Sequence, residues 1–147
     1  MKLSISEILK KCSEASKKEE KIAILRKYDS TVLRNILKMC YDANLEWMLP
    51  EGAPPYKPNP FVDQQGILYT ELRKTYLFCK GGGREDISQT KREFLYVQFL
   101  EHIDPEDAKL MIAVKDKQMP YKGITKKLVN ECWPGLIDEP QKEEVKK

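Results

Sequence analysis

Residues that build metal and redox sites are scarce in this sequence. It contains one histidine, His102, and four cysteines, no two of which form a Cys-x-x-Cys pair. Such a pair, or a histidine cluster, is the usual sign of a zinc or disulfide-exchange site. We therefore expect no metal, no cofactor and four buried free thiols in a reducing cytoplasm. The four thiols are those of Cys12, Cys40, Cys79 and Cys132.

Long apolar stretches are also absent. No run of about 18 apolar residues occurs, which argues against a membrane-spanning helix. The first residues, MKLSISEIL, lack the continuous apolar core of a signal peptide and are soon followed by lysines. These features predict a cytoplasmic protein that does not bind a membrane.

Catalytic motifs are missing as well. The glycine-rich segment KGGGRED, residues 80–86, lacks the spacing and the trailing Lys-Ser/Thr of a phosphate-binding P-loop. The segment KYDS, residues 27–30, ends in serine where the lysine motif of nucleotidyl transferases has glycine. No serine-hydrolase or zinc-protease motif appears, and no carboxylate pair stands out as general acid and base. The sequence therefore predicts a binding protein and not an enzyme.

Length and charge favour one globular domain. The chain has 147 residues, of which 33% are charged, and its formal net charge is +3. This length fits one domain, and the small net charge still allows a local basic face. We predict a single domain over residues 1–140 and a charged, disordered tail over residues 141–147.

Hydrophobic spacing and capping residues predict about seven short helices and no strand. Ser4 and Glu7 form a capping box, and Asp104 followed by Pro105 is typical of a helix start. Because every helix is short, we expect an all-α orthogonal array and not a four-helix bundle. The other helices are predicted after Ser16, after Asp29-Ser30, over Leu68–Cys79, after Asp86 or Ser88, and from Thr125 to a break at Trp133-Pro134-Gly135.

The apolar pattern also predicts which residues form the core. The stretch from Phe94 to Leu100 is the most apolar in the chain, so we expect its helix to be central and the most buried. Two other buried faces are predicted: Ile22, Ala23 and Leu25 in the second helix, and Leu33, Ile36, Leu37 and Cys40 in the third.

Five prolines fall within residues 50–60, PEGAPPYKPNP. Proline fixes the backbone and removes a donor, so this segment can form neither a helix nor a sheet ladder. We favour an ordered loop on the single domain, held by Tyr56 and Phe61. Two alternatives remain open, a flexible linker between domains and a ligand for an aromatic groove.

Positive charge gathers in two segments, residues 73–92 and 115–127. Each contains glycine followed by a helix start, where free backbone amides attract phosphate. The segment from Lys122 to Lys127 combines such amides with a hydroxyl and ammonium groups, which could clamp a DNA backbone without reading its sequence. A solvated lysine-rich surface is the alternative. Few aromatic residues lie among these lysines, which disfavours stacking on single strands.

The segment GITKKLVNECWPGLI, residues 123–137, with Glu139-Pro140 beyond it, resembles the end of the amino-terminal DNA-binding domain of T-even-type phage ATP-dependent DNA ligases. Looser similarity extends over most of residues 5–140. The resemblance implies a helical array that grips duplex DNA across the minor groove, largely through its backbone. It implies a stand-alone relative of that domain, since the nucleophile motif is missing. Residues 49–59 are similar to a segment of small proteins of T4-like phages.

Together, the charge pattern and the resemblance predict a non-sequence-specific duplex DNA-binding protein. The predicted DNA-binding residues are Gly81, Gly82, Gly83, Arg84, Lys91, Arg92, Lys122, Gly123, Thr125, Lys126 and Lys127. The alternative function is a protein–protein adaptor that acts on phage or host replication or transcription machinery. That function predicts an exposed apolar patch at Trp47, Tyr56 and Phe61. The sequence indicates no oligomeric state.

Overall fold

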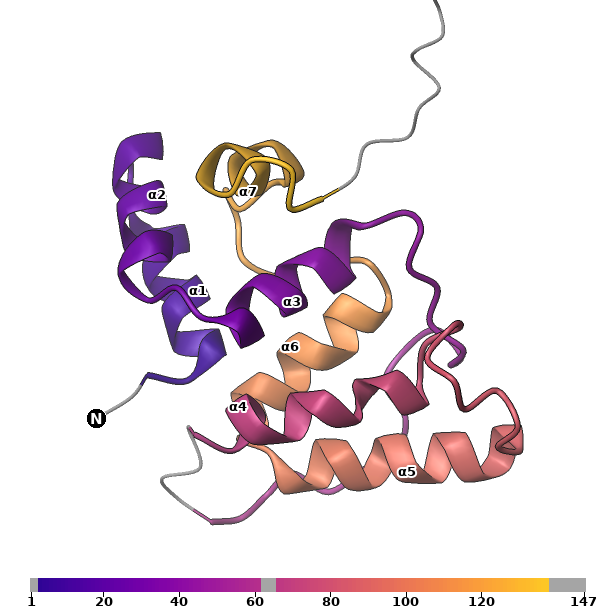
Figure 1. The fold of residues 1–147 in the computed structure, drawn as a ribbon. Helices are drawn as coiled ribbons and strands as arrows, with labels where there is room; N and C mark the ends of the chain where they lie inside the picture. Colours follow the sequence, from indigo (N-terminus) through magenta and orange to yellow (C-terminus); the bar gives the residue numbers. More distant parts are fainter. Residues whose placement is uncertain (1–2, 62–65, 138–147) are drawn as a thin grey trace, which may run out of the picture.

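The computed structural model describes residues 3–61 and 66–137. The predicted tail, residues 141–147, and the last part of the ligase-like segment, residues 138–140, lie outside the described residues. The fold is all-α (Figure 1). Its elements are α1 (Ile5–Glu14), α2 (Lys18–Lys27), α3 (Thr31–Tyr41), α4 (Ile67–Glu71), the 3-10 helix η1 (Leu72–Leu77), α5 (Gln89–His102), α6 (Pro105–Lys115) and α7 (Lys126–Cys132).

Helix α6 lies at the centre of the array. It packs against α1, α3 and α5, and Figure 1 shows it between α3 and α5. Helix α2 packs against α1 on one side and α7 on the other. Helix α4 and η1 continue into one another, and η1 borders both α3 and α5. None of the described helices is long and apolar enough to cross a membrane.

Capping side chains set most of the helix starts. In the capping box of α1, the Ser4 hydroxyl accepts the Glu7 N–H and the Glu7 carboxylate accepts the Ser4 N–H. Side chains of Ser30, Ser88, Asp104 and Thr125 cap α3, α5, α6 and α7. The sequence left Asp86 and Ser88 open for α5, and Ser88 is the residue used. Helix α2 begins one residue later than predicted: its N-cap residue is Lys17 and not Ser16.

The expectation that the helix containing Phe94 would be the most buried is wrong. Helix α5 buries one face, including Tyr96, Phe99 and Leu100, whereas Phe94 is 59% exposed. The most buried helix is α6, which is covered on several sides by its three neighbours. In α2, Leu25 is buried as predicted but Ala23 is exposed. All four predicted core residues of α3 are buried.

The fourth predicted helix changes type halfway along. It starts as α4 and continues from Leu72 as a 3-10 helix with three residues per turn. Leu68 and Leu72 are buried, as an α-helical spacing requires. The tighter winding then rotates Tyr76 outward, and this residue is 47% exposed. Beyond the helix, Cys79 forms an isolated antiparallel bridge with Trp47.

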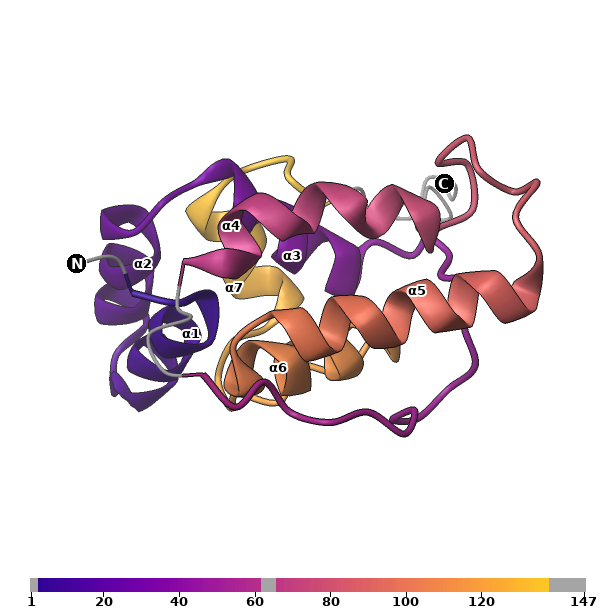
Figure 2. The ribbon, with the colours of Figure 1, turned by 90° about the horizontal axis from the view of Figure 1, so that it is seen from below.

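The proline-rich segment crosses the surface beside α5 and α6 as extended chain (Figure 2). Tyr56 is half-buried against the core, but Phe61 is 71% exposed, so only one of the two predicted anchors packs. Three donors of the segment bond to the helices: Gly52 N to Asp116 Oδ2 (3.0 Å), Lys57 N to Glu101 Oε2 (2.8 Å) and Asn59 Nδ2 to His102 O (2.9 Å). The segment is therefore ordered by backbone and polar contacts more than by its aromatic rings.

The four cysteines are free and buried. Burial raises the pKa of Cys12, Cys40 and Cys79 to about 11. These sulfurs therefore remain thiols near neutral pH and act as small apolar core groups. The prediction of buried free thiols is confirmed.

Candidate nucleic-acid interface

The turn before α7 is held by hydrogen bonds from two other helices. From α1, the Ser13 hydroxyl donates to the carbonyl of Lys122 at 2.7 Å. From α3, the Tyr41 hydroxyl donates to the carbonyl of Ile124 at 2.5 Å. Burial raises the pKa of Tyr41, which keeps this phenol protonated as a donor. The turn is thus fixed from inside, while Lys122, Gly123 and Thr125 remain exposed on its outer side.

Helix α7 begins and ends where the sequence predicts. The Thr125 hydroxyl accepts the Leu128 N–H at 3.1 Å and caps the first turn. The helix ends at Cys132, and Gly135 takes a positive φ of 84° in the break that follows. The Asn130 side chain accepts the Ile137 N–H at 3.0 Å and donates to the Ile137 carbonyl at 3.3 Å. These bonds fold the chain after the break back onto α7.

A groove of about 240 Å³ lies on the surface between α2 and α7. Three lysines and one glutamate border it, so its charge is positive. Lys18 forms an ion pair with Glu131 at 3.0 Å, and this pair raises the pKa of Lys18. Lys127 is exposed at the entrance. The residues that line this groove are Lys18, Lys21, Gly123, Thr125, Lys127, Leu128 and Glu131.

Gly123 is required by its backbone conformation, and the end of a flexible lysine side chain lies close to it. Its φ is +83°, and an added Cβ would lie 2.9 Å from Cε of Lys21. The Lys21 ammonium donates to the carbonyl of Ala15, at the end of α1. On this side of Gly123, the space beside the turn is therefore occupied by the protein's own Lys21.

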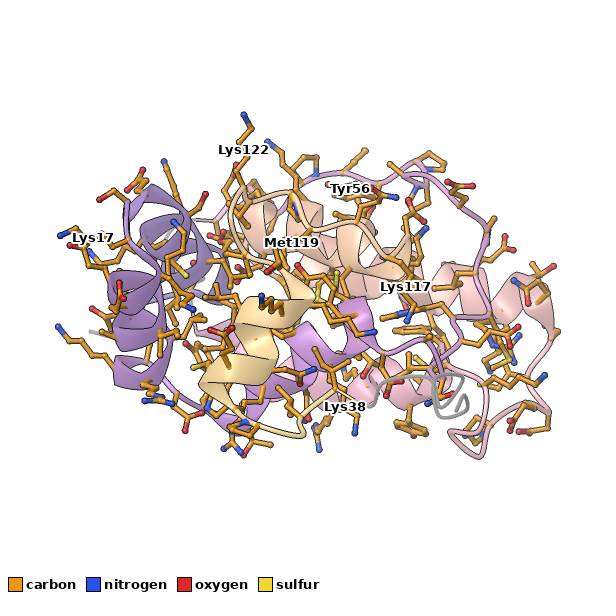
Figure 3. All side chains as sticks on the ribbon, turned by 90° about the horizontal axis from the view of Figure 1, so that it is seen from above. Lys17, Lys38, Tyr56, Lys117, Met119 and Lys122 are labelled. Atoms are coloured by element: carbon orange, nitrogen blue, oxygen red, sulfur yellow. The ribbon has the colours of Figure 1, made fainter. Side chains whose placement is uncertain are left out.

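The other lysines of the turn region differ in exposure. Lys122 points away from the body of the protein (Figure 3) and is exposed, as is Lys127, whereas Lys126 is half-buried. Exposure therefore favours Lys127 over Lys126 as a phosphate contact. Lys115 is only 5% exposed. Lys117 donates to the carbonyls of Met39 and Asp42 at 2.9 and 2.8 Å and so caps α3.

In the glycine-rich turn of Gly81, Gly82 and Gly83, two of the amides that were predicted to bind phosphate are already bonded inside the protein, since the Gly82 N–H donates to the Cys79 carbonyl at 3.2 Å and the Gly81 N–H is also used. The Gly81 N–H donates to the Glu85 carboxylate at 2.6 Å, and this bond lowers the pKa of Glu85. An internal carboxylate thus occupies the place predicted for a phosphate, and its charge would repel one. Gly82 is needed for packing, because an added Cβ would lie 2.2 Å from the Tyr76 carbonyl oxygen.

Arg92 is also removed from the predicted contact surface. It is 4% exposed, and its guanidinium lies inside the loop between η1 and α5. It donates to the carbonyls of Leu77, Arg84 and Ile87 at 3.2 Å each and to Gln89 Oε1 at 2.8 Å. Arg84 itself pairs with Asp86 at 3.1 Å. Of the predicted DNA-binding cations Arg84, Lys91 and Arg92, only Lys91 is exposed with no ion pair among the described residues.

The two predicted clusters lie far apart. In Figures 1 and 2, the loop before α5 and the start of α5 are at one end of the protein, while α7 is toward the other end. One duplex surface made from both clusters is therefore not formed. The remaining candidate is the α2–α7 corner, which we define as Lys18, Lys21, Lys122, Gly123, Thr125 and Lys127.

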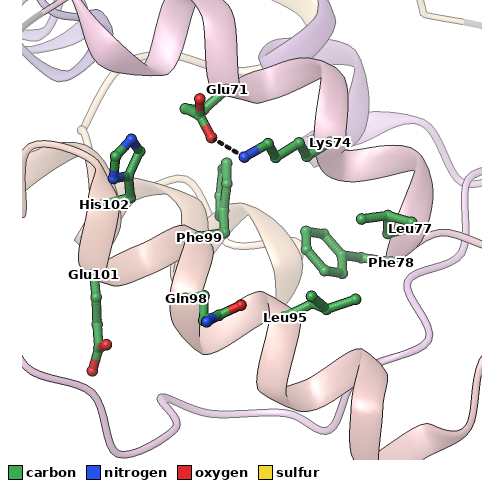
Figure 4. A pocket seen from close by; sticks show the side chains of 9 residues that line it. All are labelled: Glu71, Lys74, Leu77, Phe78, Leu95, Gln98, Phe99, Glu101 and His102. Carbon is green, nitrogen blue, oxygen red and sulfur yellow. Dashed lines mark ion pairs between the residues drawn. The ribbon is translucent and has the colours of Figure 1, made fainter.

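A separate groove of about 380 Å³ lies between η1 and α5 (Figure 4). It brings His102 and Glu101 near an ion pair in which Lys74 lies 2.7 Å from Glu71. Its lining includes no serine, threonine or cysteine that could act as a nucleophile. Among residues 3–61 and 66–137, no group of three or more histidine, cysteine or acidic residues could hold a metal.

Residues 8–121 match a protein family described as a family of unknown function, DUF6433. The chain belongs to this family. The DUF6433 match includes the proline-rich segment and all helices from α2 to α6, but the exposed part of the α2–α7 corner, from Lys122 onward, lies beyond it. No curated protein matches the chain.

Proposed function

We propose that the protein binds duplex DNA without sequence preference, through backbone phosphates at the α2–α7 corner. One observation carries this proposal. Two exposed lysines, Lys122 and Lys127, flank an exposed glycine turn and a capped helix start, and α2 adds two more lysines to the same groove. Ammonium groups, backbone amides and a hydroxyl are the groups that usually contact phosphate in protein–DNA interfaces.

The chemistry of the corner favours phosphate over bases. Lysine acts as a point charge and lacks the planar donor fork that arginine uses to read guanine. The Thr125 oxygen accepts a backbone N–H, which leaves its hydroxyl proton for a phosphate oxygen. Lys18 is held by Glu131 in an exposed ion pair, and such pairs contribute little stability. A phosphate could therefore replace the carboxylate as the partner of Lys18.

We also propose that the helical array is a relative of the ligase DNA-binding domain. The helix start at Thr125 and the stop after Cys132 support this, because both lie at the positions that the resemblance implies.

The test is a salt titration of binding to nicked, intact and single-stranded DNA. We expect both duplexes to bind more tightly than the single strand, with a log–log salt slope of about −0.9 per phosphate contacted. The variant K122E/K127E should weaken duplex binding and make the slope about 1.8 less negative if each lysine contacts one phosphate.

The matched control is K80E/K91E, which makes the same change in net charge at the other end of the protein. This control should bind duplex DNA with an affinity close to that of the unchanged chain. Equal losses from the two double variants would show a general charge effect and defeat the assignment to the corner. Unchanged affinity in K122E/K127E would do the same.

Protein binding is the second candidate function, but the patch that the sequence predicts for it is not formed. Trp47 is only 9% exposed, and Tyr56 packs against the core, so Phe61 stands alone. A different surface, an apolar groove between α3 and η1, favours this function.

A further inference from the structure

The groove between α3 and η1 has a volume of about 500 Å³ and is mainly apolar. Met39 and Leu72 form part of its floor and are almost fully buried, whereas Val32 and Leu45 are half-buried. Tyr76 borders it and is 47% exposed. This volume lies within the usual range for binding clefts. The floor is aliphatic surface whose exposure to water is unfavourable.

The charges around this groove have one sign. Its lining contains two cations, Lys38 from α3 and Arg73 from η1, and no carboxylate. Within the described residues, neither cation forms an ion pair. Their neighbours along the same helices behave differently: Arg34 pairs with Asp29 at 2.8 Å, and Lys74 pairs with Glu71 at 2.7 Å.

Lys38 has no evident structural task at the end of α3. A lysine in the last helical turn often serves the terminal carbonyls. In this protein Lys117 already donates to the carbonyls of Met39 and Asp42. Figure 3 shows Lys38 and Lys122 on opposite edges of the view, so this groove and the α2–α7 corner are separate surfaces.

We propose that the groove between α3 and η1 binds an acidic amphipathic helix of a partner protein. Apolar side chains at helical spacing would cover the floor, as in other helix-in-groove complexes. Carboxylates on the two flanks of that helix would pair with Lys38 and Arg73. Tyr76 would supply an aromatic contact, and tyrosine is enriched among the residues that dominate binding energy.

The apolar floor decides between this partner and a nucleic acid. A phosphate backbone could pair with the two cations, but it would leave the aliphatic floor uncovered. The groove between α3 and η1 shares no lining residue with the α2–α7 corner. It therefore stands or falls independently of DNA binding there.

The experiment is a selection of displayed random 16-residue peptides on the full-length protein, with counter-selection on the variant K38E/R73E. We expect enriched peptides to be acidic, with large apolar residues three and four positions apart. Fluorescence anisotropy with synthetic copies should show roughly tenfold or greater loss of affinity in K38E/R73E, and weakening with salt.

The matched control is R34E/K74E, which makes the same charge change on the same two helices outside this groove. It should bind the peptides within about twofold of the unchanged protein. If K38E/R73E melts early by circular dichroism, K38M/R73M removes the charges and keeps the apolar stems.

Several results would overturn the inference. They are the enrichment of basic or neutral peptides, no enrichment over the counter-selected variant, and equal loss in both double variants. Duplex DNA binding that is lost in K38E/R73E and kept in K122E/K127E would assign the groove to nucleic acid instead.

Discussion

Asp107 is a fully buried carboxylate in the first turn of α6. Its Oδ1 accepts the Ser6 N–H at 2.9 Å and so ties the start of α1 to α6. Its Oδ2 has no hydrogen-bond partner in the described part of the chain. Burial raises the pKa of Asp107 from 3.8 to about 6; the bond from Ser6 opposes this rise, and Asp104 and Glu7 add to it.

The direction of the pH effect follows from this pKa. Between about pH 4 and 6 the folded chain binds more protons at Asp107 than the unfolded chain does. The contribution of Asp107 to stability is therefore full below about pH 4 and is lost as the pH rises through 6. At about 1.4 kcal/mol for each tenfold change in proton affinity, the ionised carboxylate destabilises the fold by about 3 kcal/mol at neutral pH. About 2 kcal/mol of this should appear between about pH 4.5 and 7.

The variant D107N tests this reasoning. Its amide oxygen can still accept the Ser6 N–H, but the side chain cannot ionise. Its NH₂ group would replace the unpartnered Oδ2, which costs about 1–3 kcal/mol if both donors stay unpaired. At neutral pH the variant should therefore be between equal in stability and about 2 kcal/mol more stable. The pH dependence of the difference between the two proteins is the decisive quantity, because all other groups cancel in it.

Urea unfolding followed by far-UV circular dichroism, at several values between about pH 4.5 and 7.5, measures this difference. The m-value should be the same for both proteins, so that the midpoints report stability alone. A carboxyl carbon NMR titration should place the midpoint of Asp107 near pH 6. Two parallel stability curves would refute the argument, because they would mean that folding leaves the proton affinity of this carboxyl unchanged.

Two further predictions concern the candidate site. E131Q releases Lys18 from its ion pair, so we expect tighter duplex binding and a salt slope steeper by about 0.9, measured by the same titration; weaker binding would place the DNA elsewhere. Arg92→Lys removes most of the bonds from the buried guanidinium to the loop before α5, so we expect urea unfolding to show a stability lower by about 2–3 kcal/mol. The affinity of the folded protein for DNA should not change. A loss of affinity without a loss of stability would restore Arg92 to the contact surface.

Local signals in the sequence were sufficient for most helix boundaries. The caps at Ser4, Ser30, Asp104 and Thr125 act between residues two or three positions apart, so they can be found without knowing the tertiary fold. The burial of α6 could not be found this way. Six of its 11 residues are apolar, against six of 14 in α5, but its central place depends on which helices pack around it. The change from α4 to η1 could not be found from local signals either, because hydrophobic spacing alone does not distinguish an α-helix from a 3-10 helix in so short a segment.

The two predicted phosphate sites show why a glycine turn and a helix start are not enough. At residues 81–83 the turn is followed by Glu85, close enough for its carboxylate to accept the Gly81 N–H. After Gly123 the next acid is Glu131, near the end of α7, and it pairs with a lysine of α2 instead of the turn. The sequence contains this difference, because an acid within a few residues of a glycine turn competes with any external anion for its amides. Only the fold, however, could show that Lys21 approaches Gly123 and that Lys115 and Lys117 turn inward, since those contacts join residues far apart in the chain.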